Sequence, residues 1–293
     1  MLRTSFVCGL LLTIFLGTLC TSALAEDQDR PLKKGILLVA FGTTVPEARV
    51  ALDNFETRAK ERFPEMDIRW AYSSSIVRKI LADDGLAMDS PVTALAKMMD
   101  DGFTHVAVQS LHTIPGQEFH DLQKTVQAFS GLPKGMEQVT LGQPLLDTPE
   151  DLGRCVQAML SVLPQERKKD EAVVWMGHGT HHAANIYYPG LQAYLHQADP
   201  LILVGTVEGD PSLEDVLALL KNRKVSKAYL QPFMAVAGDH AQNDMAGDDE
   251  DSWKSMLEAQ KITCVPILRG TAEFPAFVDL WMNHLQAAVD LLP

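Results

Sequence analysis

Three histidines stand within five residues in the segment GHGTHH, residues 177–182. A further histidine, His240, lies in AGDHAQND, and an acidic residue, Glu208, lies in VEGDP. Two imidazoles and one carboxylate form a borderline ligand set that suits divalent Co, Fe, Ni or Zn ions. Glycines on both sides of His178 let the chain turn tightly and leave the imidazole uncovered. We therefore take His178, Glu208 and His240 as candidate ligands of one divalent metal ion.

Each of these motifs is weak on its own, and ordinary polar loop residues are the alternative interpretation. His181 and His182 do not have the spacing of one compact site on a single helix, so a structural or supporting role fits them better. The sequence contains no HExxH motif, whose two histidines bind zinc from one face of a helix. A zinc hydrolase is therefore the less favoured enzyme class.

Short apolar runs alternate with longer amphipathic segments, a pattern typical of βα units around parallel sheets. Two helices carry start signals, Ser90-Pro91 before residues 92–99 and Asp210-Pro211 before residues 213–220. The apolar runs predict two sets of four strands. The first set is 35–41, 67–71, 105–110 and 138–142, and the second is 172–176, 201–206, 227–231 and 262–266.

The two sets of strands match each other in sequence. VAFGT at residues 39–43 aligns with MGHGT at 176–180, and VQS at 108–110 aligns with LQP at 230–232. We predict an α/β fold of two similar Rossmann-like domains with parallel sheets, at residues 26–146 and 147–293. Ligands of such sheets bind outside the carboxyl ends of the strands, and the candidate ligands lie in the segments that follow three predicted strands. This places the metal site in the second domain, facing a cleft between the two.

The first 25 residues have the pattern of a signal peptide. Arg3 precedes an apolar run at residues 6–20, and Ala23-Leu24-Ala25 forms a cleavage site. The run is too short to span a bilayer, so no membrane span is expected there. Leu19 stands where a lipoprotein signal needs a small residue before Cys20. We expect an exported protein, periplasmic in a Gram-negative host. A homo-oligomer remains open.

The protein is acidic. Removal of Arg3 with the signal peptide takes the net charge from −13 to −14. Long-range repulsion disfavours nucleic acid and anionic membranes as partners. Only Cys155 and Cys264 remain after processing, so there is no disulfide framework. We expect two buried free thiols, with a single disulfide between them as the alternative.

Six segments together resemble a known family. They are GILLVAFGTT, AYSSSIVRKIL, VQSLHTIPGQEF, VVWMGHGTHH, VEGDP and GDHAQNDMAGDDEDSW, in order along the whole mature chain. The chain is similar to the anaerobic sirohydrochlorin cobaltochelatases, class II chelatases that share the ferrochelatase fold. The resemblance implies Co(II) insertion into a tetrapyrrole, sirohydrochlorin, for cobalamin biosynthesis, with Fe(II) as the alternative metal. It also implies that His178 and His240 bind the metal and that Glu208 is their acidic partner.

The signal peptide departs from this family, whose precursor synthesis is normally cytoplasmic. A second function class is therefore an exported metal or tetrapyrrole carrier that uses the chelatase fold without turnover. Because the tetrapyrroles concerned are polycarboxylates, the cleft of an acidic protein would need local cations. Arg78, Lys79 and Arg269 are the candidates, with ordinary surface charge as the alternative.

Export also separates the chain from precursor synthesis, so it could encounter finished tetrapyrroles such as haem. His120 lies on a predicted helix whose apolar face uses Phe119 and Leu122. An imidazole on the flank of that helix is a candidate axial haem ligand, between subunits or alone. A solvated surface histidine is the alternative.

Overall fold

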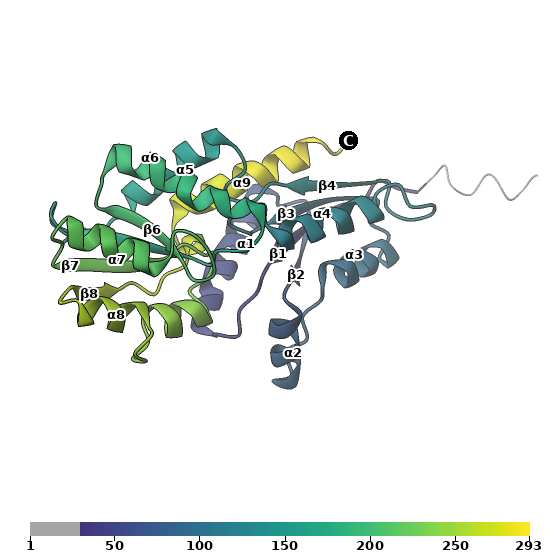
Figure 1. Ribbon diagram of the computed structural model, residues 1–293. Helices are drawn as coiled ribbons and strands as arrows, with labels where there is room; N and C mark the ends of the chain where they lie inside the picture. The colour runs from purple at the N-terminus through teal and green to yellow at the C-terminus, as the bar shows by residue number, and fades with distance from the viewer. Residues whose placement is uncertain (1–29) are drawn as a thin grey trace, which may run out of the picture. The chain divides into compact units, whose positions relative to one another are not determined.

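The computed structural model describes residues 30–293, and the predicted signal peptide and its cleavage site lie outside them. The described chain contains two four-stranded sheets, each parallel throughout, with helices packed around them (Figure 1). The two sheets have equivalent strand orders, β2-β1-β3-β4 and β6-β5-β7-β8. The predicted α/β class with two similar parallel-sheet halves is confirmed.

The first sheet uses the amino-terminal part of the chain. Its strands are β1 (Lys34–Ala40), β2 (Asp67–Tyr72), β3 (His105–Ser110) and β4 (Gln138–Gly142). The accompanying helices are η1 (Glu47–Arg49), α1 (Val50–Arg62), α2 (Ser75–Asp83), α3 (Pro91–Asp100) and α4 (Gln117–Phe129).

The second sheet repeats this order. Its strands are β5 (Ala172–Gly177), β6 (Ile202–Thr206), β7 (Lys227–Pro232) and β8 (Thr263–Pro266). The longer helices are α5 (Pro149–Ser161), α6 (Tyr187–Ala198), α7 (Leu213–Asn222), α8 (Trp253–Ala259) and α9 (Pro275–Asp290). Short turns are η2 (Ala183–Ile186), η4 (Thr271–Glu273) and η3 (Ala241–Met245), the last a single π-helical turn.

All eight strands lie within one residue of their predicted ends. The central strands could be predicted from the sequence because strands of a parallel sheet that is covered on both faces are nearly continuous apolar runs. Both β3 and β5 are buried along their whole length. One helix start was wrong. Ser212, not Asp210-Pro211, caps α7, since its hydroxyl accepts a bond from the Asp215 amide and the Asp215 carboxylate accepts one from the Ser212 amide.

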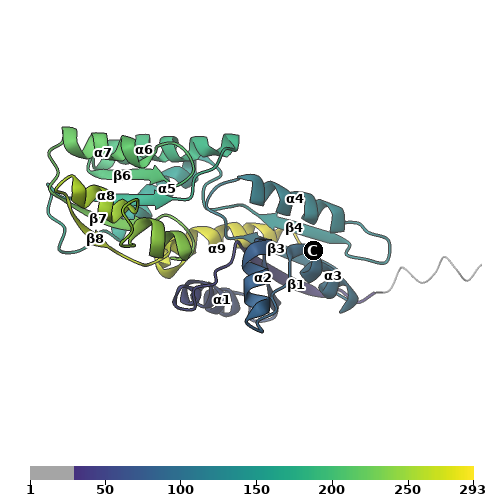
Figure 2. The ribbon, with the colours of Figure 1, turned by 60° about the horizontal axis from the view of Figure 1, so that its bottom comes forward.

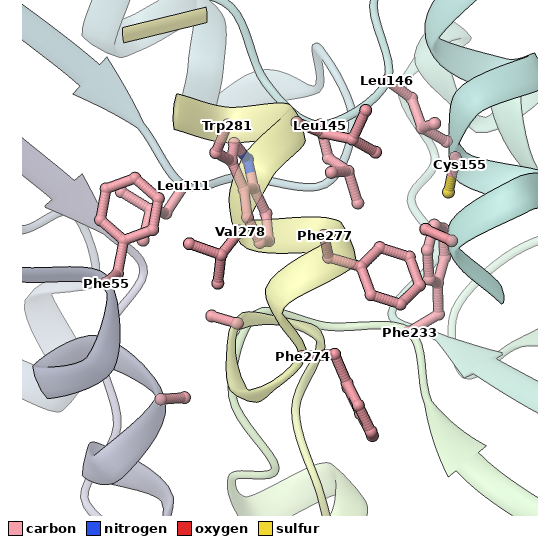
Figure 3. Packing of buried hydrophobic residues seen from close by; sticks show 14 of the residues in the cluster. Phe55, Leu111, Leu145, Leu146, Cys155, Phe233, Phe274, Phe277, Val278 and Trp281 are labelled. Carbon is pink, nitrogen blue, oxygen red and sulfur yellow. The ribbon is translucent and has the colours of Figure 1, made fainter. Parts of the chain in front are cut away.

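The C-terminal helix α9 joins the two halves. Although it follows β8, it packs against β3 and β4 of the first sheet and against α5. Its Trp281 lies edge-on to Phe55 of α1 at 6.4 Å between ring centroids, and its Phe277 lies 5.9 Å from Trp175 of β5. Figure 2 shows α9 running between the halves, and Figure 3 shows its side chains contacting both. The division at residues 146 and 147 stays a prediction, and the helix is shared across it.

The two cysteines are free thiols, as expected. Cys155 is buried, but the expectation of burial was wrong for Cys264, which is only partly buried. Within residues 30–293, no helix is long and apolar enough to cross a membrane.

Candidate active site

A cavity of about 740 Å³ lies at the carboxyl ends of the strands, and both halves line it. In the first sheet the chain runs from β1 to β2 on one side and then crosses to β3 on the other side of β1. This makes a topological switch point between β1 and β3, and the second sheet has the equivalent one between β5 and β7. Crevices at such points are the usual ligand sites of open α/β sheets. The loops after β1, β3, β5 and β7 all contribute to this cavity, so the two switch points share one space.

His178 and His240 meet in this cavity. His178 follows β5 directly, and His240 lies in the loop after β7. Their ring centroids are 4.7 Å apart and the rings are perpendicular. The predicted pairing of two imidazoles from separate strand-end loops is what the structure contains.

Hydrogen bonds fix the tautomer of both rings. The Nδ1 atom of His178 lies 3.0 Å from the Gly179 carbonyl oxygen, and that of His240 lies 2.5 Å from Oδ2 of Asp244. Because a carbonyl and a carboxylate can only accept, we place the proton of each neutral ring on Nδ1. Both Nε2 lone pairs then remain available, which is how metal-binding histidines are commonly oriented.

The loop that carries His178 is held by close backbone packing. Gly179 has a φ of +79°, and a Cβ there would lie 2.8 Å from the Gly209 nitrogen. The Glu208 amide donates to the His178 carbonyl at 2.8 Å, so the loops after β5 and β6 run side by side. Beneath them, the Tyr188 hydroxyl accepts a bond from the Gly179 amide. Burial raises the pKa of the Tyr188 phenol to about 12, so it stays neutral.

Glu208 lines the same cavity with an exposed side chain. Among residues 30–293, however, no three His, Cys, Asp or Glu side chains are gathered closely enough to hold a metal ion. The structure therefore joins His178 with His240 and does not gather Glu208 into one cluster with them. Its role as a ligand stays a prediction.

The remaining histidines of GHGTHH have different positions. His181 is exposed. His182 caps η2, and its Nδ1 accepts a bond from the Ala184 amide, which leaves the proton on Nε2. The His182 ring lies 5.0 Å from that of His120, which is partly buried on α4. This contact supports the structural role expected of His182 and places His120 between elements of the two halves.

His112 lines the cavity from the first half, after β3. Its Nδ1 lies 2.8 Å from the Ser110 hydroxyl and its Nε2 lies 3.3 Å from that of Ser73. Burial lowers the pKa of His112 to about 4. The ring is therefore neutral under ordinary conditions, hydrogen-bonded on both nitrogens.

The cations proposed for the cleft lie elsewhere. The Arg78 guanidinium donates to the main-chain carbonyls of Tyr72 and Ser73 at the end of β2. Arg269 pairs with Glu273 and lies over the Phe274 ring. Within the described chain, neither these two, nor Lys79, nor any other Lys or Arg is among the residues that line the cavity.

The sequence interpretation missed two supporting residues. Tyr188 is the second residue of α6, and the sequence gives no signal of its contact with Gly179. Asp244 follows His240 by four residues, a spacing that brings side chains together on a helical turn. That spacing could have identified it as the partner of His240.

The chain matches one family of known proteins over most of its length. Residues 34–290 match the family described as cobalt chelatase (CbiK). The chain is 46% identical over 271 residues to sirohydrochlorin cobaltochelatase CbiKC of Nitratidesulfovibrio vulgaris (strain Hildenborough), covering 92% of this chain and 96% of the relative. It is 36% identical over 262 residues to sirohydrochlorin cobaltochelatase of Salmonella typhimurium (strain LT2), covering 89% and 98%.

Solved structures share the fold at low sequence identity. SirB from Bacillus subtilis with Fe3+ has a TM-score of 0.57 at 14% identity, over 88% of this chain and 96% of that one. CbiX, described as the terminal enzyme for biosynthesis of siroheme in denitrifying bacteria, has a TM-score of 0.54 at 15% identity, over 87% and 99%. These likenesses concern the fold alone.

The Asp244 contact predicts a loss of metal affinity. Asp244→Asn removes the carboxylate that fixes the His240 tautomer, so Co(II) affinity should fall about 10-fold to 100-fold. Calorimetric titration with Co(II) measures this. Asn243→Ala is the matched control, because the Asn243 amide donates to Asp239 and not to His240. Equal affinities of Asp244→Asn and wild type would refute the role given to Asp244.

Burial of His112 predicts a stability loss in acid. The unfolded chain binds a proton at His112 below its ordinary pKa of 6.5, while the folded chain resists until about pH 4. Stability from this group is therefore present above pH 6.5 and lost as the pH falls toward 4, by about 3 kcal/mol. Urea unfolding at pH 7 and 4.5 should show a smaller loss for His112→Gln than for wild type. The exposed His181→Gln should lose as much as wild type, and equal losses in all three proteins would be the contrary result.

Proposed function

The chain belongs to the cobalt chelatase (CbiK) family, and we propose that it works through a metal site built on His178 and His240. It is a sirohydrochlorin cobaltochelatase, which exchanges two pyrrole N–H protons for one Co(II) ion. Both relatives are named as cobaltochelatases, so the comparisons favour Co(II) over Fe(II) as the metal that is inserted. The observation that carries the site assignment is the pair of imidazoles 4.7 Å apart in the shared cavity.

The Nε2 atoms of the two histidines hold the incoming Co(II). The two imidazoles leave the other coordination positions to one carboxylate, to water and then to pyrrole nitrogens, so the ion can pass to the macrocycle. An open ligand set of this kind suits transfer better than a closed four-ligand structural site. We assign the third position to Glu208, which lines the same cavity.

Proton removal follows from the same groups. When the metal moves to the pyrrole nitrogens, the Nε2 lone pairs of the histidines become free to accept a proton, and a neutral imidazole is a common general base. The imidazolium so formed on His240 lies against the Asp244 carboxylate, which stabilises its positive charge. The second proton leaves to Glu208 or to water.

Replacing either histidine should abolish most turnover. His178→Ala or His240→Ala leaves one imidazole, so the rate of Co(II) insertion should fall about 100-fold or more, and the double variant should be little worse because the ligands act as a unit. The absorption change of sirohydrochlorin with Co(II), against a protein-free control, gives the rate. His181→Ala, which alters an exposed neighbour, should keep wild-type activity. Wild-type turnover by His178→Ala would refute the assignment.

The same assay separates enzyme from carrier. A chelatase accelerates metal insertion over many equivalents of sirohydrochlorin. A carrier that uses this fold without turnover would saturate at a fixed stoichiometry and leave the rate at the protein-free value. Acceleration beyond one equivalent therefore contradicts the carrier alternative.

We also propose that the protein is exported. The support is the run at residues 6–20 followed by Ala23-Leu24-Ala25, which predicts a mature chain starting at Glu26. N-terminal sequencing of protein from its native host, with periplasmic fractionation if that host is Gram-negative, is the measurement. An intact Met1 would contradict export.

Haem binding at His120 is a further proposal that accompanies export. Its support is the position of the imidazole, which stays partly exposed on α4 beside the His182 ring. Protein purified from a haem-replete host should show a Soret band that His120→Ala removes, because a missing axial ligand changes the haem spectrum. No band, or a band unchanged in His120→Ala, would favour the solvated surface histidine.

A further inference from the structure

Apolar side chains stand exposed on the first-half wall of the cavity. Ile76 and Ile80 of α2 are 71% and 44% exposed, and Phe41, directly after β1, is 45% exposed. All three line the cavity, and the two isoleucines are four residues apart, so they share one face of the helix. We call Phe41, Ile76 and Ile80 the apolar wall. Gathered exposed apolar side chains in a cavity indicate a surface that a ligand covers.

The charged residues of the cavity have the wrong sign for a polyanion. Glu118, Glu208 and Asp239 line it, and no Lys or Arg does within the described chain. Sirohydrochlorin carries several carboxylates, which these acidic groups repel. Pairing of the carboxylates with protein cations inside the cavity is therefore not available as the source of affinity.

The proposed metal ligands and the apolar wall line the same cavity from different halves. His178 and His240 belong to loops of the second sheet, whereas Phe41 and α2 belong to the first. A flat macrocycle in this space has one face toward the imidazoles and the other toward the apolar wall. Removing the apolar face of the ring and three exposed side chains from water at once is favourable in proportion to the area covered.

We propose that the enzyme binds sirohydrochlorin by its ring face, against Phe41, Ile76 and Ile80, with the carboxylates directed out of the cavity into solvent. This inference rests on the proposed function. It makes the apolar wall the determinant of substrate affinity and positions the ring with its nitrogens toward the metal ligands. It also explains how an acidic cavity accepts an acidic substrate.

The first test is the affinity for metal-free sirohydrochlorin, measured by fluorescence titration so that cobalt chemistry does not contribute. Ile76→Ala and Phe41→Ala should each raise the Kd about 10-fold, because each removes contact area from the ring. Ile186→Ala is the matched control, since Ile186 is 67% exposed and lies outside the cavity lining. Phe41→Leu, which keeps an apolar side chain, should restore much of the affinity.

The second test is salt. Screening weakens repulsion between the substrate and the acidic cavity, so raising potassium chloride from about 50 mM to about 500 mM should lower the Kd or leave it unchanged. Lys79→Ala, which removes an exposed cation of α2 outside the cavity lining, should change the Kd less than about 2-fold. A Kd that rises with salt, together with weaker binding by Lys79→Ala, would overturn the proposal in favour of carboxylate pairing.

Two further outcomes separate this inference from the function on which it rests. If the variants of the apolar wall keep wild-type metal insertion and an unchanged Kd for sirohydrochlorin, the inference alone is overturned. If those variants also change their elution volume in size-exclusion chromatography, the apolar wall is instead a contact surface for a second copy of the chain. A wild-type protein that neither binds nor metallates sirohydrochlorin overturns both.

Discussion

Two Nδ1–H groups with fixed acceptors determine what this site can do. His178 is held by the carbonyl of its own neighbour, Gly179, and His240 by Asp244, so both rings present Nε2 to one cavity. The acceptors differ in kind. A main-chain carbonyl fixes orientation, while a carboxylate also stabilises positive charge on the ring. In the proposed mechanism the pair therefore holds a divalent ion and, after its departure, carries a proton, which are the two requirements of metal insertion.

This arrangement depends on the order of the strands. The neighbouring strands β5 and β7 bring their following loops together at the switch point, and a side chain at position 179 would collide with the loop after β6. The first sheet repeats the order and supplies the opposite wall. Helix α9 packs on both halves through Phe277 and Trp281. Because closely packed side chains leave the two halves little room to move, this core fixes the distance between the two walls of the cavity.

The sequence predicted what depends on local pattern. Apolar runs predicted the eight strands, and the match of VAFGT with MGHGT predicted two similar halves. The positions of His178 and His240 after two strands of the second set predicted that both lie at one edge of the second sheet. Tertiary contacts decided the rest. Arg78 donates to the carbonyls at the end of β2, which no spacing reveals, and Glu208 follows its strand yet is not gathered with the histidines. The packing of α9 on the first sheet joins residues too distant in sequence for any pattern to indicate.

The coordination of bound Co(II) tests the central claim most directly. X-ray absorption at the cobalt edge of the Co(II)-loaded protein should show two imidazole nitrogens at about 2.1 Å, with oxygen ligands completing the shell. One imidazole should disappear in His178→Ala and one in His240→Ala. A cobalt shell without imidazole scattering, or the same two-imidazole shell in His178→Ala, would contradict the account.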